Sequence, residues 1–241
     1  MKRIILTLCL FVFVFSSYAQ DSADDKIDVG LSLNLDAFFG FAPMMTFSYA
    51  LSETDAFTAY GIQWGAGTGS AWGEWTEFGI GYNKTVGDFD FNPQIGFTMG
   101  SLLSSGAAQE GIVGDGIVPN LTIGYDTDTM EGEFYFGYYG ALSNNTELGN
   151  STNNYVHYWA NLGFKAGSFL SIGAHFEELY LSGGDINGGG SLDRADGYQW
   201  LGPYVQMAKG NAGLRFSFGG NLVSDGFAPN DFYKLAFFMN L

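Results

Sequence analysis

The stretch Ile27–Asp36 reads IDVGLSLNLD, in which every second residue is aliphatic and the residues between are polar or glycine. Successive side chains of a β-strand point to opposite faces, so such a stretch has one apolar and one polar face. Tyr233–Leu241, which reads YKLAFFMNL, repeats the pattern with an apolar residue at every second position. Both stretches are therefore predicted to be strands that are apolar on one side only.

The same alternation recurs along the chain and predicts about twelve strands. The predicted strands are 27–36, 41–51, 57–65, 74–84, 89–100, 117–126, 133–142, 155–165, 169–181, 198–207, 212–223 and 232–241. Short connections such as Gly87-Asp88 alternate with longer ones such as Ser182–Gly197. Short turns at one end and long loops at the other are typical of transmembrane β-barrels. Ala37–Gly40 is the exception, because it is a short connection on the long-loop side.

The composition of the two faces favours a membrane barrel. The apolar face carries aliphatic and aromatic residues, among them Tyr60, Ile62 and Trp64 of strand 57–65, with Tyr and Trp near strand ends as at a membrane interface. The other face is mostly Gly, Asn, Ser and Thr. A soluble β-sandwich or lipocalin-like barrel is the alternative, but it would need a charged outer face. We predict an all-β fold, a transmembrane antiparallel up-and-down β-barrel of about 12 strands.

Residues 1–19 have the features of a secretory signal peptide. Lys2 and Arg3 precede the apolar segment Ile4–Phe15, and Ser17-Tyr18-Ala19 is a small-x-small cleavage signal. Cleavage after Ala19 would leave residues 20–241 as a single barrel domain in the outer membrane, with both chain ends in the periplasm. No other stretch approaches the roughly 20 apolar residues that a membrane helix needs.

The composition also limits the possible partners. The 241 residues carry a net charge of −16 with 9 Lys and Arg, and phosphate binding depends on cationic side chains, so no nucleic acid is expected. The single cysteine, Cys9, lies in the signal peptide, so the mature barrel has no thiol chemistry. The expected partners are outer-membrane lipids and a small solute.

The YAQ end of the signal peptide, the glycine- and aromatic-rich hairpins and the terminal strand with Leu235, Phe237, Met239 and Leu241 resemble the small porin-like outer-membrane barrels of Bacteroidota. The resemblance is architectural and covers the whole mature chain. It implies the outer-membrane location, and it implies that the barrel-insertion machinery reads the apolar last residue, where Phe is commoner than Leu241. Many such families have no assigned function, so it implies no cargo.

The polar faces define the lumen and carry both histidines. Their charged residues and rings are Asp28, Asp36, Glu77, Glu133, Glu177, Lys165 and Arg215, with Tyr135, Tyr139, Tyr155, Trp159, Trp200 and Tyr204. A turn centred on Gly167 would pair His157 with Glu177 and Trp159 with His175. We therefore predict a lumen polar cluster, listed here in full: His157, His175, Glu177, Trp159, Lys165 and Arg215.

This cluster allows more than one role. Two imidazoles and a carboxylate can ligate zinc, but no fourth ligand or general base is evident, so a hydrogen-bonded polar pair is preferred. In a water-filled lumen the carboxylate would favour the imidazolium form of His157, and a pore would then change its charge selectivity at mildly acidic pH. An enzyme is not predicted, because a lipid hydrolase would need Ser and His together on the lipid-facing surface, where neither histidine lies.

The lumen leaves two functions open, since twelve strands fall between the filled eight-stranded barrels and the sixteen-stranded channels. Glycines open space and rings fill it. The favoured function is passive passage or binding of a small solute in a narrow, mildly cation-preferring lumen. The alternative is a non-conducting structural barrel whose external loops bind a partner.

Asp185–Asp196, which reads DINGGGSLDRAD, resembles a calcium-binding loop. Asp185, Asn187, Asp193 and Asp196 occupy positions 1, 3, 9 and 12, and position 6 is glycine. Position 5 lacks a side-chain ligand, and strands rather than helices flank the loop. An ordinary glycine-rich external loop is the default interpretation, calcium is possible there, and no other cofactor is predicted.

Overall fold

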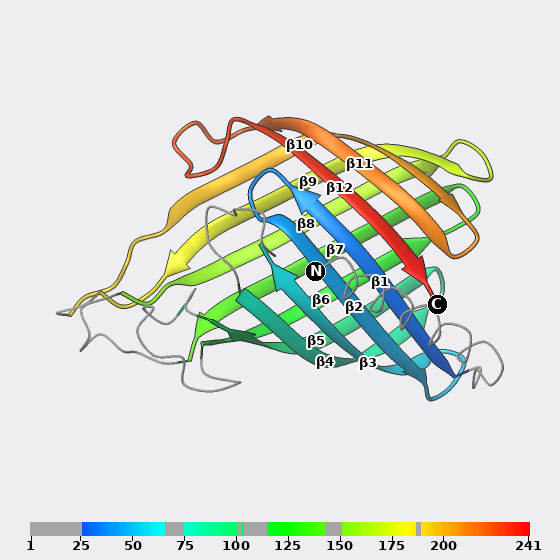
Figure 1. The fold of residues 1–241 in the computed structure, drawn as a ribbon, viewed down its shortest axis with the longest axis horizontal. Coiled ribbons are helices and arrows are strands. Elements are labelled where there is room, and N and C mark those ends of the chain that lie inside the picture. Colours follow the sequence, from blue (N-terminus) through cyan, green and yellow to red (C-terminus); the bar gives the residue numbers. More distant parts are fainter. Residues whose placement is uncertain (1–25, 66–74, 101–102, 104–114, 143–150, 187–188) are drawn as a thin grey trace, which may run out of the picture.

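Twelve strands form one closed antiparallel sheet in the computed structural model, which describes residues 26–65, 75–100, 103, 115–142, 151–186 and 189–241. Each strand pairs with its neighbours in sequence, and β1 pairs with β12 to close the barrel (Figure 1). The strands are β1 (Ile27–Asp36), β2 (Gly40–Ala50), β3 (Asp55–Trp64), β4 (Trp75–Val86), β5 (Phe89–Met99), β6 (Gly116–Asp126), β7 (Met130–Ala141), β8 (Asn154–Lys165), β9 (Leu170–Gly183), β10 (Ala195–Lys209), β11 (Ala212–Asn221) and β12 (Asp231–Asn240). The predicted fold class is confirmed.

The alternation located the strands closely, because the starts of β7 and β10 differ most from prediction, by three residues each. Among the described residues, no helix is long and apolar enough to cross a membrane. The tight turns lie at one end of the barrel, which we call the short-turn end. One of them is the hairpin at Gly87, whose positive φ of 61° suits glycine. The other end is the long-connection end.

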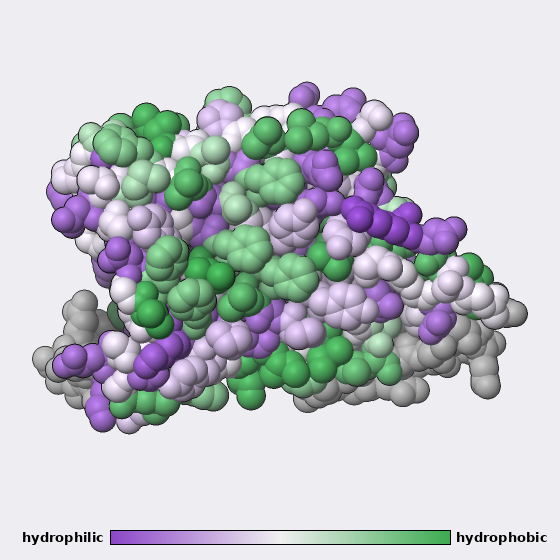
Figure 2. All heavy atoms as spheres, turned by 180° about the vertical axis from the view of Figure 1, so that it is seen from behind, coloured by the Kyte–Doolittle hydropathy of each residue, from purple (hydrophilic) through white to green (hydrophobic). Residues whose placement is uncertain are grey.

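Large apolar side chains cover the outside of the barrel, and Figure 2 shows them gathered over its wall. The exposed ones on strands include Phe78, Ile80, Tyr82, Leu162, Phe164, Ile172, Leu201, Met207, Phe216, Phe218, Tyr233, Leu235 and Phe237. Contiguous exposed apolar surface of this extent is unusual for a soluble monomer and suits a hydrocarbon surrounding.

The predicted orientation of β3 is wrong. Tyr60 and Ile62 are buried in the lumen, whereas Phe57 is exposed on the outer wall. The reason lies in the neighbouring strands, because the small outward residue Gly61 pairs with Met45 and Phe78, and the Phe78 ring covers it. Large neighbours thus supply the apolar surface that β3 lacks, and its own large side chains are free to fill the lumen.

The predicted β8–β9 register is also wrong, by two residues. Trp159 pairs with Glu177, and Asn161 pairs with His175. The turn is longer than predicted, since the Ala166 N–H donates to the Leu170 carbonyl at 2.8 Å. A shift of two residues preserves the side-chain faces, so both histidines still point into the lumen.

Candidate functional site

The short β1–β2 connection folds into the lumen. Phe38 and Phe39 are each only 3% exposed. The Asp36 carboxylate accepts their backbone N–H groups at 2.8 and 2.6 Å, and the Ala37 N–H donates to the Tyr233 carbonyl at 3.1 Å. A carboxylate that bonds nearby backbone N–H groups fixes a local turn. The connection is thereby fastened to both β1 and β12.

The two phenylalanine rings bridge the lumen. The Phe38 ring centroid lies 5.4 Å from that of Tyr198 on β10, and the Phe39 centroid lies 4.8 Å from Trp64 on β3 and 5.9 Å from Trp75 on β4. Strands β10 and β4 are on opposite sides of the twelve-strand ring. We define the aromatic plug as this cluster of rings: Phe38, Phe39, Trp64, Trp75, Tyr198, Trp200 and Phe232.

The packing of the plug is nearly complete. A cavity of about 10 Å³ remains beside it, which is the room that one water molecule requires. Its lining consists of Phe39, Trp64, Trp75, Tyr139, Tyr155, His157 and Leu179. Packed rings therefore fill the section of the lumen that the plug occupies.

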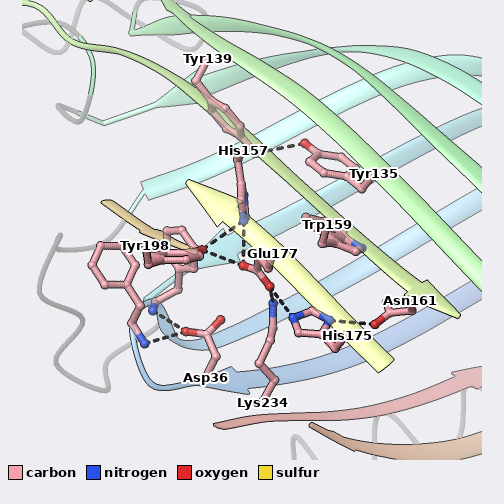
Figure 3. Close-up of polar contacts among 12 residues, drawn as sticks. Asp36, Tyr135, Tyr139, His157, Trp159, Asn161, His175, Glu177, Tyr198 and Lys234 are labelled. Atoms are coloured by element: carbon pink, nitrogen blue, oxygen red, sulfur yellow. Dashed lines mark hydrogen bonds and ion pairs between the residues drawn. The ribbon is translucent and has the colours of Figure 1, made fainter. Parts of the chain in front are cut away.

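A charged cluster lies beside the plug, and Figure 3 shows the Glu177 carboxylate between His157, His175 and Lys234. His157 Nε2 is 2.8 Å from Glu177 Oε1, and His175 Nε2 is 3.1 Å from Oε2. Lys234 forms an ion pair with Oε2 and also lies opposite Asp36 in the β1–β12 register. We define the charged cluster as Asp36, His157, His175, Glu177 and Lys234. It joins β1 and β12 to β8 and β9.

The charged cluster is shielded from water. His157 is 2% exposed and Glu177 is fully buried, while the Lys234 side chain is 25% exposed. The Tyr198 hydroxyl donates to Glu177 at 2.7 Å, and His175 Nδ1 lies 2.7 Å from Asn161 Oδ1. The expectation that the histidines face a water-filled lumen is therefore wrong, because the aromatic plug and the histidines' own hydrogen-bond partners enclose them.

Four of the six predicted cluster residues come together, and two do not. Trp159 joins the two histidines and Glu177, and its ring stacks on Tyr135 at 4.0 Å. Lys165 lies at the short-turn end, where it pairs with Asp126 at 2.5 Å. Arg215 lies apart from Glu177 and donates to Gln206 at 2.8 Å.

The sequence prediction missed the cation of the charged cluster, Lys234, and the two turn residues of the plug, whereas Trp200 was among the predicted lumen rings. Lys234 lies between the outward-facing Tyr233 and Leu235, so the alternation already indicated its inward position. No comparable signal marks Phe38 and Phe39, because a turn residue has no alternating partner from which its direction can be read.

The predicted calcium ligands do not converge in the described residues. Asp196 lies in β10 and accepts bonds from the Arg194 guanidinium at 3.2 and 3.3 Å. Asp185 forms a bridge with Ser191, Asp193 is exposed, and Asn187 lies outside the described residues. No group of three His, Cys, Asp or Glu side chains within the described ranges is placed to hold a metal ion. Calcium binding stays a prediction from the sequence.

Nearer the short-turn end the lumen is polar and more open. We define the polar section as Glu131, Glu133, Trp159, Gln206 and Arg215, of which all but Gln206 are partly exposed. The Trp159 N–H donates to Glu133 at 2.6 Å, and Gln206 donates to Glu131 at 2.5 Å. Each of these two carboxylates thus accepts a hydrogen bond from a neutral side chain.

Tyrosine rings in the lumen lie against the wall over glycines. A Cβ at Gly163 or Gly173 would overlap the Tyr204 ring, whose hydroxyl donates to Glu131 at 3.0 Å. Tyr60 lies over Gly79 in the same way and donates to Glu77 at 2.5 Å. The glycines therefore let these rings follow the wall, and closure of the lumen depends on the plug.

Replacing Gly163 with alanine is expected to lower the free energy of unfolding by about 1–3 kcal/mol, because the new methyl group displaces Tyr204 from the wall and from Glu131. Urea unfolding of the reconstituted barrel, followed by gel mobility without heating, measures the change. Gly124→Ala is the matched control, since its Cβ would meet nothing closer than 3.6 Å. Equal stability of the two variants would contradict the packing of Tyr204 on Gly163.

A closed antiparallel barrel with an apolar outer wall and a polar inner wall is the fold of outer-membrane β-barrel proteins. The chain belongs to the family of unknown function DUF6733, whose model matches residues 1–241. No curated protein matches it.

Solved structures of outer-membrane proteins share the fold, among them the two that follow. An outer membrane channel from Pseudomonas putida F1 is similar with a TM-score of 0.59 and 10% identity over 92% of this chain and 99% of that one. The NanC porin is similar with a TM-score of 0.52 and 8% identity over 88% of this chain and 100% of that one. At these identities the likeness concerns the fold alone.

Proposed function

We propose that this protein is an outer-membrane barrel for the passive passage of a small solute, and that the described conformation is its closed form. The observation that supports the proposal is which residues close the lumen. Phe38 and Phe39, from one short connection, bridge the lumen, whereas rings such as Tyr204 and Tyr60 lie along the wall. Displacement of a single turn would therefore remove the two rings that bridge the lumen.

In this proposal the short-turn end faces the periplasm. Both ends of the described barrel lie there, since the Asn240 N–H donates to Asn211 in the β10–β11 turn at 2.8 Å, and the Leu241 N–H donates to Val29 at 2.8 Å. A signal peptide over residues 1–19, which lie outside the described part, would deliver the chain to that side. Lipids around the apolar wall and the barrel-insertion machinery are the partners that this implies, in a bacterium of the Bacteroidota. We propose no enzymatic role.

The charges in the lumen favour cations over anions. The inward acidic residues include Asp28, Asp36, Glu77, Asp126, Glu131, Glu133 and Glu177, and the inward basic residues include Lys165, Arg215 and Lys234. A passage lined by an excess of one sign concentrates ions of the opposite sign. The solute of the proposal is therefore neutral, cationic or dipolar rather than anionic.

In planar bilayers we expect the wild type to open rarely and to favour K⁺ over Cl⁻ in its open events. The reversal potential across a KCl gradient measures this preference. Glu133→Gln is expected to weaken it, because Glu133 is partly exposed in the polar section, whereas Thr54→Ala in the exposed β2–β3 turn should leave it unchanged. Anion preference of the wild type would contradict the proposed lumen.

The second candidate is a non-conducting structural barrel that displays its external connections. The observation that favours it is the packing of the lumen, since the plug rings are buried together and the Glu177 carboxylate is bonded to both histidines. This function would be preferred if neither the wild type nor a variant without the plug rings conducts.

A further inference from the structure

We propose that the polar section binds a small zwitterionic solute, with the solute carboxylate at Arg215 and its ammonium group at Glu131 and Glu133. The inference rests on the proposed function, because it names the class of solute that would use this lumen. It concerns binding, however, and binding can be measured without any conductance.

The first observation is that opposite charges share this section without pairing. Among the described residues, no ion pair joins Arg215 to Glu131 or Glu133, and none joins either glutamate to another cation. Unpaired charges of opposite sign attract strongly in a partly buried site. If these side chains served only to fill the lumen, the opposite charges would be expected to form ion pairs, as Glu177 and Lys234 do in the charged cluster.

The second observation explains what keeps the charges apart. The Gln206 amide lies between them, because its nitrogen donates to Glu131 at 2.5 Å and its oxygen accepts from Arg215 Nε at 2.8 Å. Both charges are thus within hydrogen-bond reach of one amide group. A ligand with a charge at each end can satisfy both.

The third observation is that rings hold the charged groups in place. The Arg215 guanidinium lies over the Tyr204 ring at 5.0 Å, and the Tyr204 hydroxyl donates to Glu131 at 3.0 Å. The second glutamate is held in the same way, because the Trp159 ring stacks on Tyr135 at 4.0 Å and the Trp159 N–H donates to Glu133 at 2.6 Å. A site whose side chains are already ordered loses less entropy when a ligand binds.

A ligand with one charge fits this site less well. An anion at Arg215 would lie near two carboxylates, and a cation at the glutamates would lie near the guanidinium. A zwitterion avoids both repulsions and makes two charge-assisted hydrogen-bonded contacts, which are the stronger kind. The chemistry of the site therefore favours a molecule that carries an ammonium and a carboxylate group.

The test titrates the detergent-solubilised full-length protein with three matched probes, followed by ligand-observed NMR. Glycylglycine carries both charges, N-acetylglycylglycine carries only the carboxylate, and glycylglycinamide carries only the ammonium. We expect glycylglycine to bind about tenfold more tightly than either analogue, since one charge-assisted contact contributes about that factor. Equal binding of the three probes, or no binding of glycylglycine, would overturn the proposal.

Two variants assign the ends of the ligand. Arg215→Gln should remove the advantage of glycylglycine over glycylglycinamide, and Glu131→Gln with Glu133→Gln should remove its advantage over N-acetylglycylglycine. Arg215→Lys keeps a cation and should retain part of the preference. Lys84→Gln, whose partner Asp55 lies outside the polar section, is the control and should bind as the wild type does. Preferences that survive both substitutions would also overturn the assignment.

The outcomes separate this inference from the proposed function. Selective binding in a protein that never conducts would support the site and contradict passage. Conductance without selective binding would support passage and contradict the site. Gel mobility without heating confirms that each variant is folded before it is titrated.

Discussion

Replacing Phe38 and Phe39 together with alanine is expected to raise the open probability of the barrel on the order of tenfold or more, because hydrophobic constrictions close pores by excluding water. The two rings fill the space between Tyr198 on one side of the lumen and Trp64 and Trp75 on the other. Without the two rings, these three side chains would still line the facing walls. Single-channel recording in planar bilayers measures the effect.

A matched control removes two phenylalanine rings from elsewhere. Phe216 and Phe218 stack on each other at 5.5 Å on the outer face of β11, and both are exposed there. Alanine at both positions should leave the conductance unchanged. If the Phe38 and Phe39 double variant folds and stays as silent as the wild type, the plug is not what closes the lumen, and the structural barrel becomes the better interpretation.

The second large effect concerns the charged cluster. Glu177→Gln is expected to lower the free energy of unfolding by about 3 kcal/mol, because removal of one partner leaves a buried charge without compensation. Lys234 would then face Asp36 alone, and the glutamine amide would offer one acceptor oxygen where the carboxylate offered one to each histidine. Urea unfolding in detergent, monitored by tryptophan fluorescence and gel mobility, gives the change.

The double variant Glu177→Gln with Lys234→Met decides whether the loss comes from the unpaired charge. It should be more stable than Glu177→Gln alone, because the cation is removed together with the carboxylate it paired with, while Asp36 keeps the Phe38 and Phe39 N–H donors. Lys165→Met is the comparison for an exposed pair, since Asp126 is 75% exposed, and it should cost less than about 1 kcal/mol. Additive losses from Glu177 and Lys234 would show that their ion pair contributes nothing.

The strand pattern was readable from the sequence because a strand has a side-chain period of two and one face meets lipid. That period located all twelve strands and the inward direction of His157, His175 and Glu177. It failed at β3, where Gly61 is small enough for the Phe78 ring to cover it, so that the larger residues turn inward. Which face of a strand points into the lumen can depend on the neighbouring strands when the two faces are similar in polarity.

What the sequence by itself determined is the barrel: its strands, its apolar wall and the set of polar residues that face inward. Only the tertiary structure decided which of these residues meet. Glu177 and Lys234 lie on strands that are not adjacent, and their contact depends on how the sheet curves to closure. The direction of Phe38 and Phe39 depends on the Asp36 carboxylate that fixes their turn. Periodicity assigns a side chain to a face, whereas contacts across a lumen depend on curvature and on turns, which have no period.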